Sequence, residues 1–278
     1  MTITTEQLAA YRAHLRAEER CAATVAKYLH DAGAFALWLD DRPLTKEAVA
    51  DWKAELLRRG QAPATVNAAL AALNGLFRFL GREDCRVKFL KVQRRAFRDG
   101  SRELTQGEYA ALVETARSKG RTRLALLLET IGGTGVRVSE VAYITVEAAE
   151  RGRAEIAMKG KIRTILLSAK LRRKLLKYAK EQGVSSGYIF RTASGRPLSR
   201  HQIWAELKSL CKAAGVEPSK VFPHNLRHLF AVAFYKASRD IVKLADVLGH
   251  SSIETTRIYL MTTEKEHQRQ LDRLRLVS

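Results

Sequence analysis

The chain has 278 residues, more than one compact domain usually contains, and its 46% apolar content predicts two domains with sizeable cores. The 49 Lys and Arg residues outnumber the 29 Asp and Glu residues, and the formal net charge of +20 favours a polyanionic partner such as nucleic acid, although general solubility or ribosome association would also explain it. Three widely spaced cysteines, the lack of a signal-peptide core and the absence of a long apolar run argue against secreted and membrane-spanning proteins and predict a cytoplasmic one.

Helical patterns dominate the first ninety residues. Thr4 and Gln7 have the spacing of a capping box at the start of a first helix. Thr45 and Pro63 are typical of the residues that begin a third and a fourth helix. The helices after the first are predicted over residues 24–41, 47–60 and 64–81. We interpret residues 1–90 as a four-helix domain of a kind that can clamp DNA.

A basic segment follows this domain. Residues 86–102 hold seven basic residues and one acidic residue, Asp99. Residues 91–103 are therefore interpreted as a linker between domains that touches phosphate. The candidate contacts with DNA are Arg94, Arg95 and Arg98. A basic linker that is merely solvated is the alternative.

The remaining residues, 104–278, predict an α+β domain. Thr105 and Glu108 form a second capping-box pattern, and residues 154–168 read as two short strands joined at Lys159–Gly160. Residues 169–183 predict an amphipathic helix whose Leu171, Leu175 and Tyr178 face inward. Other helices are predicted over residues 108–120, 123–133, 200–214, 224–238 and 240–248.

The segment Phe222–His228 carries the pattern H-x-x-R. Pro223 favours a helix start, which places His224 and Arg227 on one helical face. An imidazole beside a guanidinium can bind one phosphate, and the helix N-terminus adds positive potential. A pair that forms a surface salt bridge is the simpler interpretation of this pattern taken alone.

A second informative segment runs from Gly249 to Tyr259. Gly249 is expected to end one helix, and Ser251 with Glu254 forms a capping box for the next. Tyr259 would then lie about two turns into that helix, nine residues after His250. A single Tyr on an amphipathic helix usually belongs to the core, so its candidacy as a nucleophile depends on the other motifs.

Glycines precede a third candidate, Arg137. Residues 132–136 read as a glycine-rich turn that would expose backbone N–H groups to phosphate, with Arg137 at the start of the next helix. The spacing does not match a Walker A loop, and the dinucleotide-binding pattern is also absent.

Taken in order, these motifs resemble the tyrosine recombinase (phage integrase) family, most closely its short two-domain Xer-type members. The matching segments are TGVRVSE, MKGKIRTILL, PHNLRH and LGHSSIETTRIY. The resemblance implies a mainly α fold, with a SAM-like N-terminal core-binding domain of four helices. It also implies an α+β catalytic domain with a small antiparallel hairpin.

The resemblance also implies the roles of the site residues. Tyr259 would attack a DNA phosphodiester and form a 3′-phosphotyrosine, while Arg137 and Arg227 would stabilise the transition state. Lys159 would act as the general acid. The other expected members are His224 as base or hydrogen-bond partner, His250 as a positioning group, Glu140 as a carboxylate that supports the site, and Lys161 and Arg163 as DNA contacts.

The implied partners are a double-stranded DNA core site and three further copies of the chain, which form a homotetramer on synapsed DNA and exchange strands through a Holliday junction. The oligomeric state without DNA, a monomer included, stays open. No high-energy cofactor is expected, because the phosphotyrosine ester keeps the energy of the bond that it replaces. No metal is expected either, because arginines would stabilise the charge on the phosphate. The protein is expected to associate with the nucleoid.

The C-terminal tail resembles a segment that family members pass to a neighbouring subunit. Its apolar residues are Leu271, Leu274, Leu276 and Val277. The alternative is that the tail folds back on its own domain.

Two other functions remain open at this point. A type IB topoisomerase shares the tyrosine chemistry but works as a monomer on one duplex. A non-catalytic DNA-binding protein on a recombinase scaffold would keep the fold without the reaction.

Overall fold

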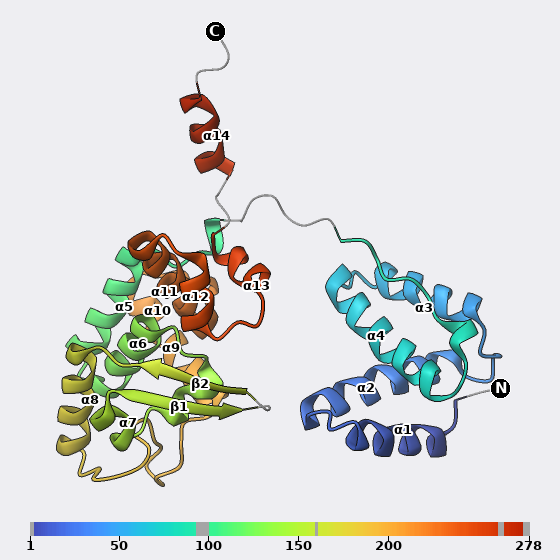
Figure 1. The fold of residues 1–278 in the computed structure, drawn as a ribbon, viewed down its shortest axis with the longest axis horizontal. Helices are drawn as coiled ribbons and strands as arrows, with labels where there is room; N and C mark the ends of the chain where they lie inside the picture. The colour runs from blue at the N-terminus through green and yellow to red at the C-terminus, as the bar shows by residue number, and fades with distance from the viewer. Residues whose placement is uncertain (1–2, 93–99, 159–160, 261–263, 275–278) are drawn as a thin grey trace. The chain divides into compact units, whose positions relative to one another are not determined.

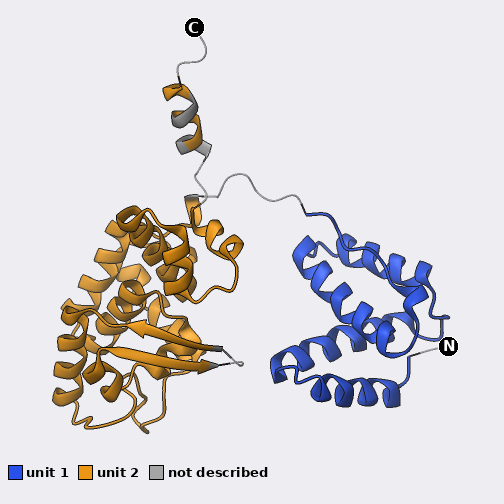
Figure 2. Cartoon of the chain, in the orientation of Figure 1, with its two compact units in different colours: residues 1–94 blue, residues 95–278 orange. Residues whose placement is uncertain are grey.

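The computed structural model describes residues 3–92, 100–158, 161–260 and 264–274. The chain divides into two compact units, residues 1–94 and 95–278 (Figure 2). The boundary falls inside the segment that the sequence predicts as a linker. Arg94, Arg95 and Arg98, the predicted linker contacts, lie outside the described residues.

The first unit contains the four predicted helices (Figure 1). Both halves of the capping box between Thr4 and Gln7 are present, the Thr45 side chain accepts from the N–H of Ala48, and Pro63 is the first residue of its helix. The helices are α1 (Thr5–Ala17), α2 (Ala22–Leu39), α3 (Lys46–Arg58) and α4 (Pro63–Phe79), followed by a short 3-10 helix, Glu83–Cys85.

Aromatic and aliphatic side chains from these helices fill one core. Phe35 of α2 is fully buried and lies 6.1 Å, centroid to centroid, from Trp52 of α3 and from Phe77 of α4. Tyr11 of α1 packs into the same cluster. Burying one such large side chain stabilises the fold by about 1.5–3 kcal/mol, so the helices hold together through this cluster.

The second unit is mainly helical and includes one two-stranded antiparallel sheet within the described residues. Its predicted mainly α character and small hairpin are confirmed. No helix in the described part is long and apolar enough to cross a membrane. The helices are α5 (Gln106–Ser118), α6 (Thr122–Thr134), α7 (Val146–Arg151), α8 (Ala169–Glu181), α9 (Arg200–Lys208), α10 (Cys211–Ala214), α11 (Pro223–Ser238), α12 (Ile241–Leu248), α13 (Ile253–Arg257) and α14 (Glu264–Arg273).

The hairpin consists of β1 (Arg153–Met158) and β2 (Lys161–Leu166), with Ile156 opposite Arg163. Side chains alternate between the two faces, so Ile156 and Ile165 enter the core while Ile162 is 82% exposed. Lys159, the predicted general acid, lies between the strands and outside the described residues.

The glycine-rich segment before Arg137 differs from its prediction. Gly132 and Gly133 belong to α6, and their N–H groups are not part of an open turn. A Cβ on Gly132 would lie 2.8 Å from the Tyr109 ring, so close packing explains this glycine. Gly135 ends the helix with φ +63°, and its N–H donates to the Ile131 carbonyl.

The segment that carries Tyr259 also differs. The N-cap of α13 is Ser252, one residue later than predicted, and its side chain accepts from the N–H of Glu254. The helix ends at Arg257, and Tyr259 lies in a following 3-10 helix, Ile258–Leu260. Tyr259 packs from this 3-10 helix into a small cluster with Ala231, Leu244 and Leu248.

The C-terminal helix α14 gives no test of the predicted docking of the tail. Leu274 is 57% exposed. The side chain of Leu271 and the residues Leu276 and Val277 lie outside the described part of the chain.

The two glycines near the end of α6 predict opposite effects of alanine. A Cβ on Gly135 would lie 2.4 Å from Phe230 at a positive φ, whereas a Cβ on Gly133 would meet no described atom within 4 Å. We expect Gly135→Ala to destabilise the second unit by at least about 2 kcal/mol and Gly133→Ala to stabilise it by at most about 1 kcal/mol. Scanning calorimetry measures both, and equal shifts would contradict the packing around Gly135.

Candidate active site

Arg227 lies at the centre of the site and is only 3% exposed. It comes from the first turns of α11, which begins at Pro223 as predicted. Its Nη1 donates to the Gly135 carbonyl, and its Nη2 donates to the Leu248 carbonyl at 2.7 Å. One guanidinium thereby joins α11 to the ends of α6 and α12.

Arg137 and Glu140 form a local pair at the start of a 3-10 helix, Val138–Tyr143. The backbone N–H of Arg137 donates to Glu140 Oε2 at 2.8 Å, and its Nη1 donates to Oε1 at 2.9 Å. Its Nη2 also reaches the Gly249 carbonyl at 3.4 Å. The Arg137 side chain keeps 39% of its surface exposed, whereas that of Glu140 is buried.

Arg163 of β2 completes this arrangement from the hairpin. Its Nη2 donates to Glu140 Oε2 at 2.8 Å, and its Nη1 donates to the Leu248 carbonyl. The Arg163 side chain is only 12% exposed, so its guanidinium contacts groups of the protein more than solvent. The predicted contact of Arg163 with DNA is not tested by these bonds.

Positive charge exceeds negative charge in this part of the described structure. Arg137, Arg163 and Arg227 gather around one carboxylate, Glu140. Burial lowers the pKa of Arg163 to about 10 and also lowers the pKa of Arg227, in each case with a contribution from Arg137. Guanidinium groups remain cationic at neutral pH despite these shifts, so the site is built to attract an anion such as phosphate.

Tyr259 is 4% exposed and packs among three imidazole rings. The ring centroid of His228 lies 5.4 Å from that of Tyr259, and those of His224 and His250 each lie 5.8 Å away. The positive charge of Arg227 interacts electrostatically with the Tyr259 side chain. Tyr259 is therefore enclosed by imidazole rings next to a fixed positive charge.

The contacts of His250 determine its tautomer. Arg227 Nη2 lies 3.0 Å from His250 Nε2, and an arginine can only donate, so Nε2 accepts and carries no proton. The proton therefore resides on Nδ1, which donates to Thr256 Oγ1 at 2.8 Å. Burial and the nearby Arg227, Arg137 and Arg163 lower the pKa of His250 to about 4, which keeps the ring neutral at physiological pH.

His224 stands at the exposed edge of the same group. Partial burial, followed by the charges of Arg227 and Arg137, lowers the pKa of its imidazole. A neutral imidazole next to a phenol is able to accept a proton.

Four of these residues, Arg137, Glu140, Arg163 and His250, border an open cleft of about 860 Å³. The cleft lies between the hairpin, the 3-10 helix that starts at Val138 and the connection from α12 to α13. Within the described residues, no group of three or more His, Cys, Asp and Glu side chains is arranged to hold a metal ion. The lining residues are Arg137, Ser139, Glu140, Ile156, Ile162, Arg163, Arg200, Gly249, His250, Ser251 and Thr255.

The tertiary structure brings most of the predicted site residues together. Arg137 bonds to Glu140, Arg227 bonds to His250, and Arg163 connects these two pairs. Tyr259 packs against the rings of His224 and His250. Lys159 lies outside the described residues, as does the side chain of Lys161.

The sequence interpretation missed two residues, Thr256 and Arg200, and the inward orientation of a third, Arg163. Thr256 is fully buried and holds His250, yet its helical position carries no distinctive signal. Arg200 borders the cleft from the start of α9, where a basic residue is common. The inward orientation of Arg163 could have been predicted from the sequence, because strand alternation places it on the same face as the apolar Ile165.

Comparison with known proteins gives matches over both units. The model of the phage integrase family matches residues 102–266, and that of the phage integrase N-terminal SAM-like domain matches residues 8–84. The second match confirms the predicted SAM-like character of the N-terminal domain.

Similar proteins span nearly the whole chain. Tyrosine recombinase XerA of Pyrococcus furiosus is 29% identical, with 99% of this chain and 96% of the relative covered. Tyrosine recombinase XerC of Roseiflexus castenholzii is 32% identical, with 91% and 88% covered. Among solved structures, a lambda integrase dimer bound to a COC′ core site aligns with a TM-score of 0.74 and 20% identity, covering 93% of this chain and 95% of that one.

The bonds of His250 predict its behaviour in solution. Two-bond ¹H–¹⁵N correlation spectra of the free protein should show the neutral Nδ1–H tautomer at pH 7, with His250→Gln used for assignment. The titration midpoint of the His250 imidazole should lie near pH 4 in the folded protein and near the ordinary value of about 6.5 in urea. The unfolded chain binds more protons between these values, so stability falls as the pH is lowered through this window.

Thr256 variants provide the matched comparison. Thr256→Val leaves the buried Nδ1–H without an acceptor and should destabilise the second unit by about 1–3 kcal/mol, whereas Thr256→Ser should retain the tautomer. Detection of the Nε2–H tautomer in the wild-type protein would contradict this arrangement.

Proposed function

Because the chain belongs to the phage integrase family of tyrosine recombinases, we propose that Tyr259 is the residue through which it cuts and rejoins DNA. The family assignment confirms the resemblance that the motifs indicated, and site-specific DNA recombination is the function of the chain. The observation that carries the proposal is the packing of the buried Tyr259 ring against the imidazoles of His224 and His250, beside the cationic group that contains Arg227.

In the proposed reaction, the Tyr259 oxygen attacks the phosphorus of a DNA phosphodiester. A bond forms between this oxygen and phosphorus, and the bond from phosphorus to the 5′ oxygen breaks, which leaves a 3′-phosphotyrosine and a free 5′ hydroxyl. The phenolic proton passes to His224, whose ring lies beside that of Tyr259. Rejoining reverses these steps with a 5′ hydroxyl from another strand.

Arg137 and Arg227 would bind the non-bridging oxygens as charge develops on the phosphate. The exposed part of the Arg137 side chain borders the cleft, and Glu140 fixes its orientation. His250 keeps Arg227 in place by accepting its hydrogen bond. We assign His250 a positioning role because its Nε2 has no proton to give in the free protein.

Lys159 is proposed as the general acid that protonates the departing 5′ oxygen. It follows Met158, the last residue of β1, in a hairpin whose neighbouring side chains border the cleft. The proposal for Lys159 depends on this connection and on the family motif.

The partner is proposed to be a double-stranded core site bound by a homotetramer. The net charge of +20 supports a DNA partner, and so do relatives whose solved structures contain a core site or a substrate DNA. We place the protein in the cytoplasm with the nucleoid for the same reason. The proposed contacts outside the active site are Arg94, Arg95, Arg98 and Lys161.

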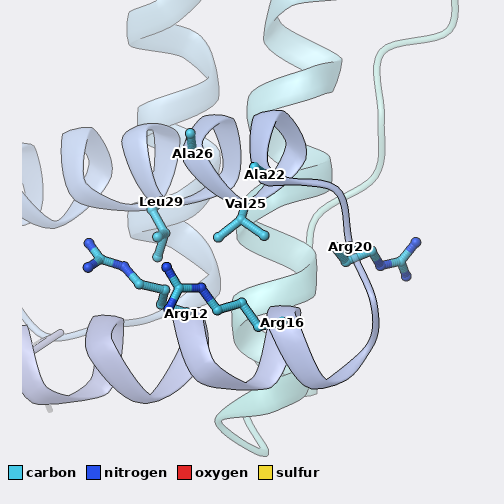
Figure 3. A pocket seen from close by; sticks show the side chains of 7 residues that line it. All are labelled: Arg12, Arg16, Arg20, Ala22, Val25, Ala26 and Leu29. Atoms are coloured by element: carbon cyan, nitrogen blue, oxygen red, sulfur yellow. The ribbon is translucent and has the colours of Figure 1, made fainter. Parts of the chain in front are cut away.

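The first unit offers a further surface for phosphate. Arg12 and Arg16 of α1 lie one turn apart and border a groove against Val25 and Leu29 of α2 (Figure 3). Neither arginine makes an ion pair within the described residues. Unpaired guanidinium groups over an apolar floor favour a polyanion, which supports DNA binding along α1.

Covalent capture tests the nucleophile. Wild-type protein, Tyr259→Phe and the control Tyr188→Phe are incubated with sheared genomic DNA that includes the flanks of the encoding locus. After denaturation, DNA should remain attached to the wild type and to Tyr188→Phe but not to Tyr259→Phe, because only that variant lacks the attacking oxygen. Sequencing the attached ends would identify the core site, and an adduct with Tyr259→Phe at the wild-type rate would refute the mechanism.

The α1 surface predicts a change in salt dependence. The double variant Arg12→Ala/Arg16→Ala should weaken DNA binding and reduce the slope of log K against log salt by about 2, because each lost phosphate contact removes about 0.9. Arg58→Ala in the same unit, an exposed residue paired with Glu55, should leave the slope unchanged. An unchanged slope in the double variant would exclude Arg12 and Arg16 from the interface.

A further inference from the structure

Arg163 binds the two acceptors that hold the two proposed phosphate-binding arginines. The Glu140 carboxylate accepts from Arg137 and also from Arg163. The Leu248 carbonyl accepts from Arg227 and also from Arg163. Arg163 therefore connects two separate hydrogen-bonded pairs that share no other side chain among those described.

The packing around Arg163 shows that its position is closely specified. Its Cδ lies 2.5 Å from the point where a Cβ on Gly249 would stand, so only glycine fits beside it. Gly249 also has φ +62°, which favours glycine independently. Within the described residues, the buried Nε of Arg163 has no hydrogen-bond partner, so the binding of the two acceptors by Nη1 and Nη2 outweighs one unsatisfied donor.

The same bonds tie the hairpin to the rest of the site. Arg163 lies opposite Ile156, and two residues further toward the turn Lys161 lies opposite Met158. Lys159 is the residue that follows Met158. If the position of Arg163 changed, β2 and its partner β1 would move with it, and so would the two strand ends, Met158 and Lys161, that precede and follow Lys159–Gly160.

We propose that Arg163 is a positioning residue that sets the hairpin carrying Lys159 in register with Arg137 and Arg227. This inference rests on the proposed roles of Lys159, Arg137 and Arg227. Two groups of a planar guanidinium bind two acceptors at once, which one ammonium cannot do with the same geometry. A lysine at this position would keep the charge but lose the connection.

The test compares Arg163→Met, Arg163→Lys and the control Arg153→Met on the duplex recovered by covalent capture. Arg153 lies on the same hairpin and pairs with Glu155 at the surface. We expect Arg163→Met and Arg163→Lys to cleave more slowly by up to about 100-fold, the loss that a misplacement of about 1 Å can cause. Their DNA affinity and salt slope should stay near those of the wild type, and Arg153→Met should cleave within about twofold.

The leaving group separates positioning from a general loss of structure. On a duplex with sulfur in place of the bridging 5′ oxygen, departure needs no proton, so the part of the loss caused by a misplaced Lys159 should disappear. A merely structural defect would slow both substrates equally. A salt slope reduced by about 1 in Arg163→Met but not in Arg163→Lys would instead make Arg163 a phosphate contact and overturn the proposal.

Hydrogen exchange of the free protein tests the inference without any reaction. Amides of β1, β2 and the segment at Leu248–Gly249 should exchange faster in Arg163→Met than in the wild type or Arg153→Met, and unchanged exchange would overturn the proposal. The experiments distinguish a wrong inference about Arg163 from a wrong proposed function. If wild type forms no adduct, or Tyr259→Phe does form one, the function fails, while the exchange result still decides the role of Arg163.

Discussion

The second unit is organised around the burial of one guanidinium group. A cation taken out of water needs hydrogen-bond acceptors or an opposite charge beside it, and leaving it unpaired would cost several kcal/mol. Arg227 meets this demand with the carbonyls of Gly135 and Leu248 and the imidazole of His250. Gly135 and Gly249 turn the chain at positive φ beside these groups, which places the helix ends around Arg227.

The hydrogen bonds of Arg227 also determine where His250 carries its proton. Because Arg227 donates to Nε2, His250 must hold its proton on Nδ1, and the buried Thr256 is there to accept it. The lowered pKa of His250 follows from burial and from the surrounding arginines. The tautomer of His250 is therefore set by a chain of hydrogen bonds that starts at Arg227 and ends at Thr256.

Stability and function make opposing demands on this cluster. Several arginines near one carboxylate repel one another, and an apolar substitute could stabilise such an interior better. In the proposed reaction, a phosphate that enters the cleft supplies the negative charge that this arrangement lacks. Tyr259 is held beside the arginines by the small apolar cluster around Leu244 and Leu248, so the proposed nucleophile and the proposed phosphate-binding groups share one scaffold.

The amino-acid sequence alone determined the features that depend on neighbours along the chain. Capping boxes at Thr4 and Thr105 and the helix start at Pro223 follow from contacts within four residues, and each was found as predicted. The order of chemical motifs likewise identified the family. The alternation of β2 could have marked Arg163 as inward-facing, because a period of two is local.

Only the tertiary structure decided what depends on contacts between distant segments. Gly132 is required by the ring of Tyr109, and Tyr259 is buried in a cluster formed with α11 and α12. The tautomer of His250 and the two partners of Arg163 involve residues 23 and 85 positions away along the chain. Local spacing carries no record of such contacts, because they exist only once the helices and the hairpin have packed together.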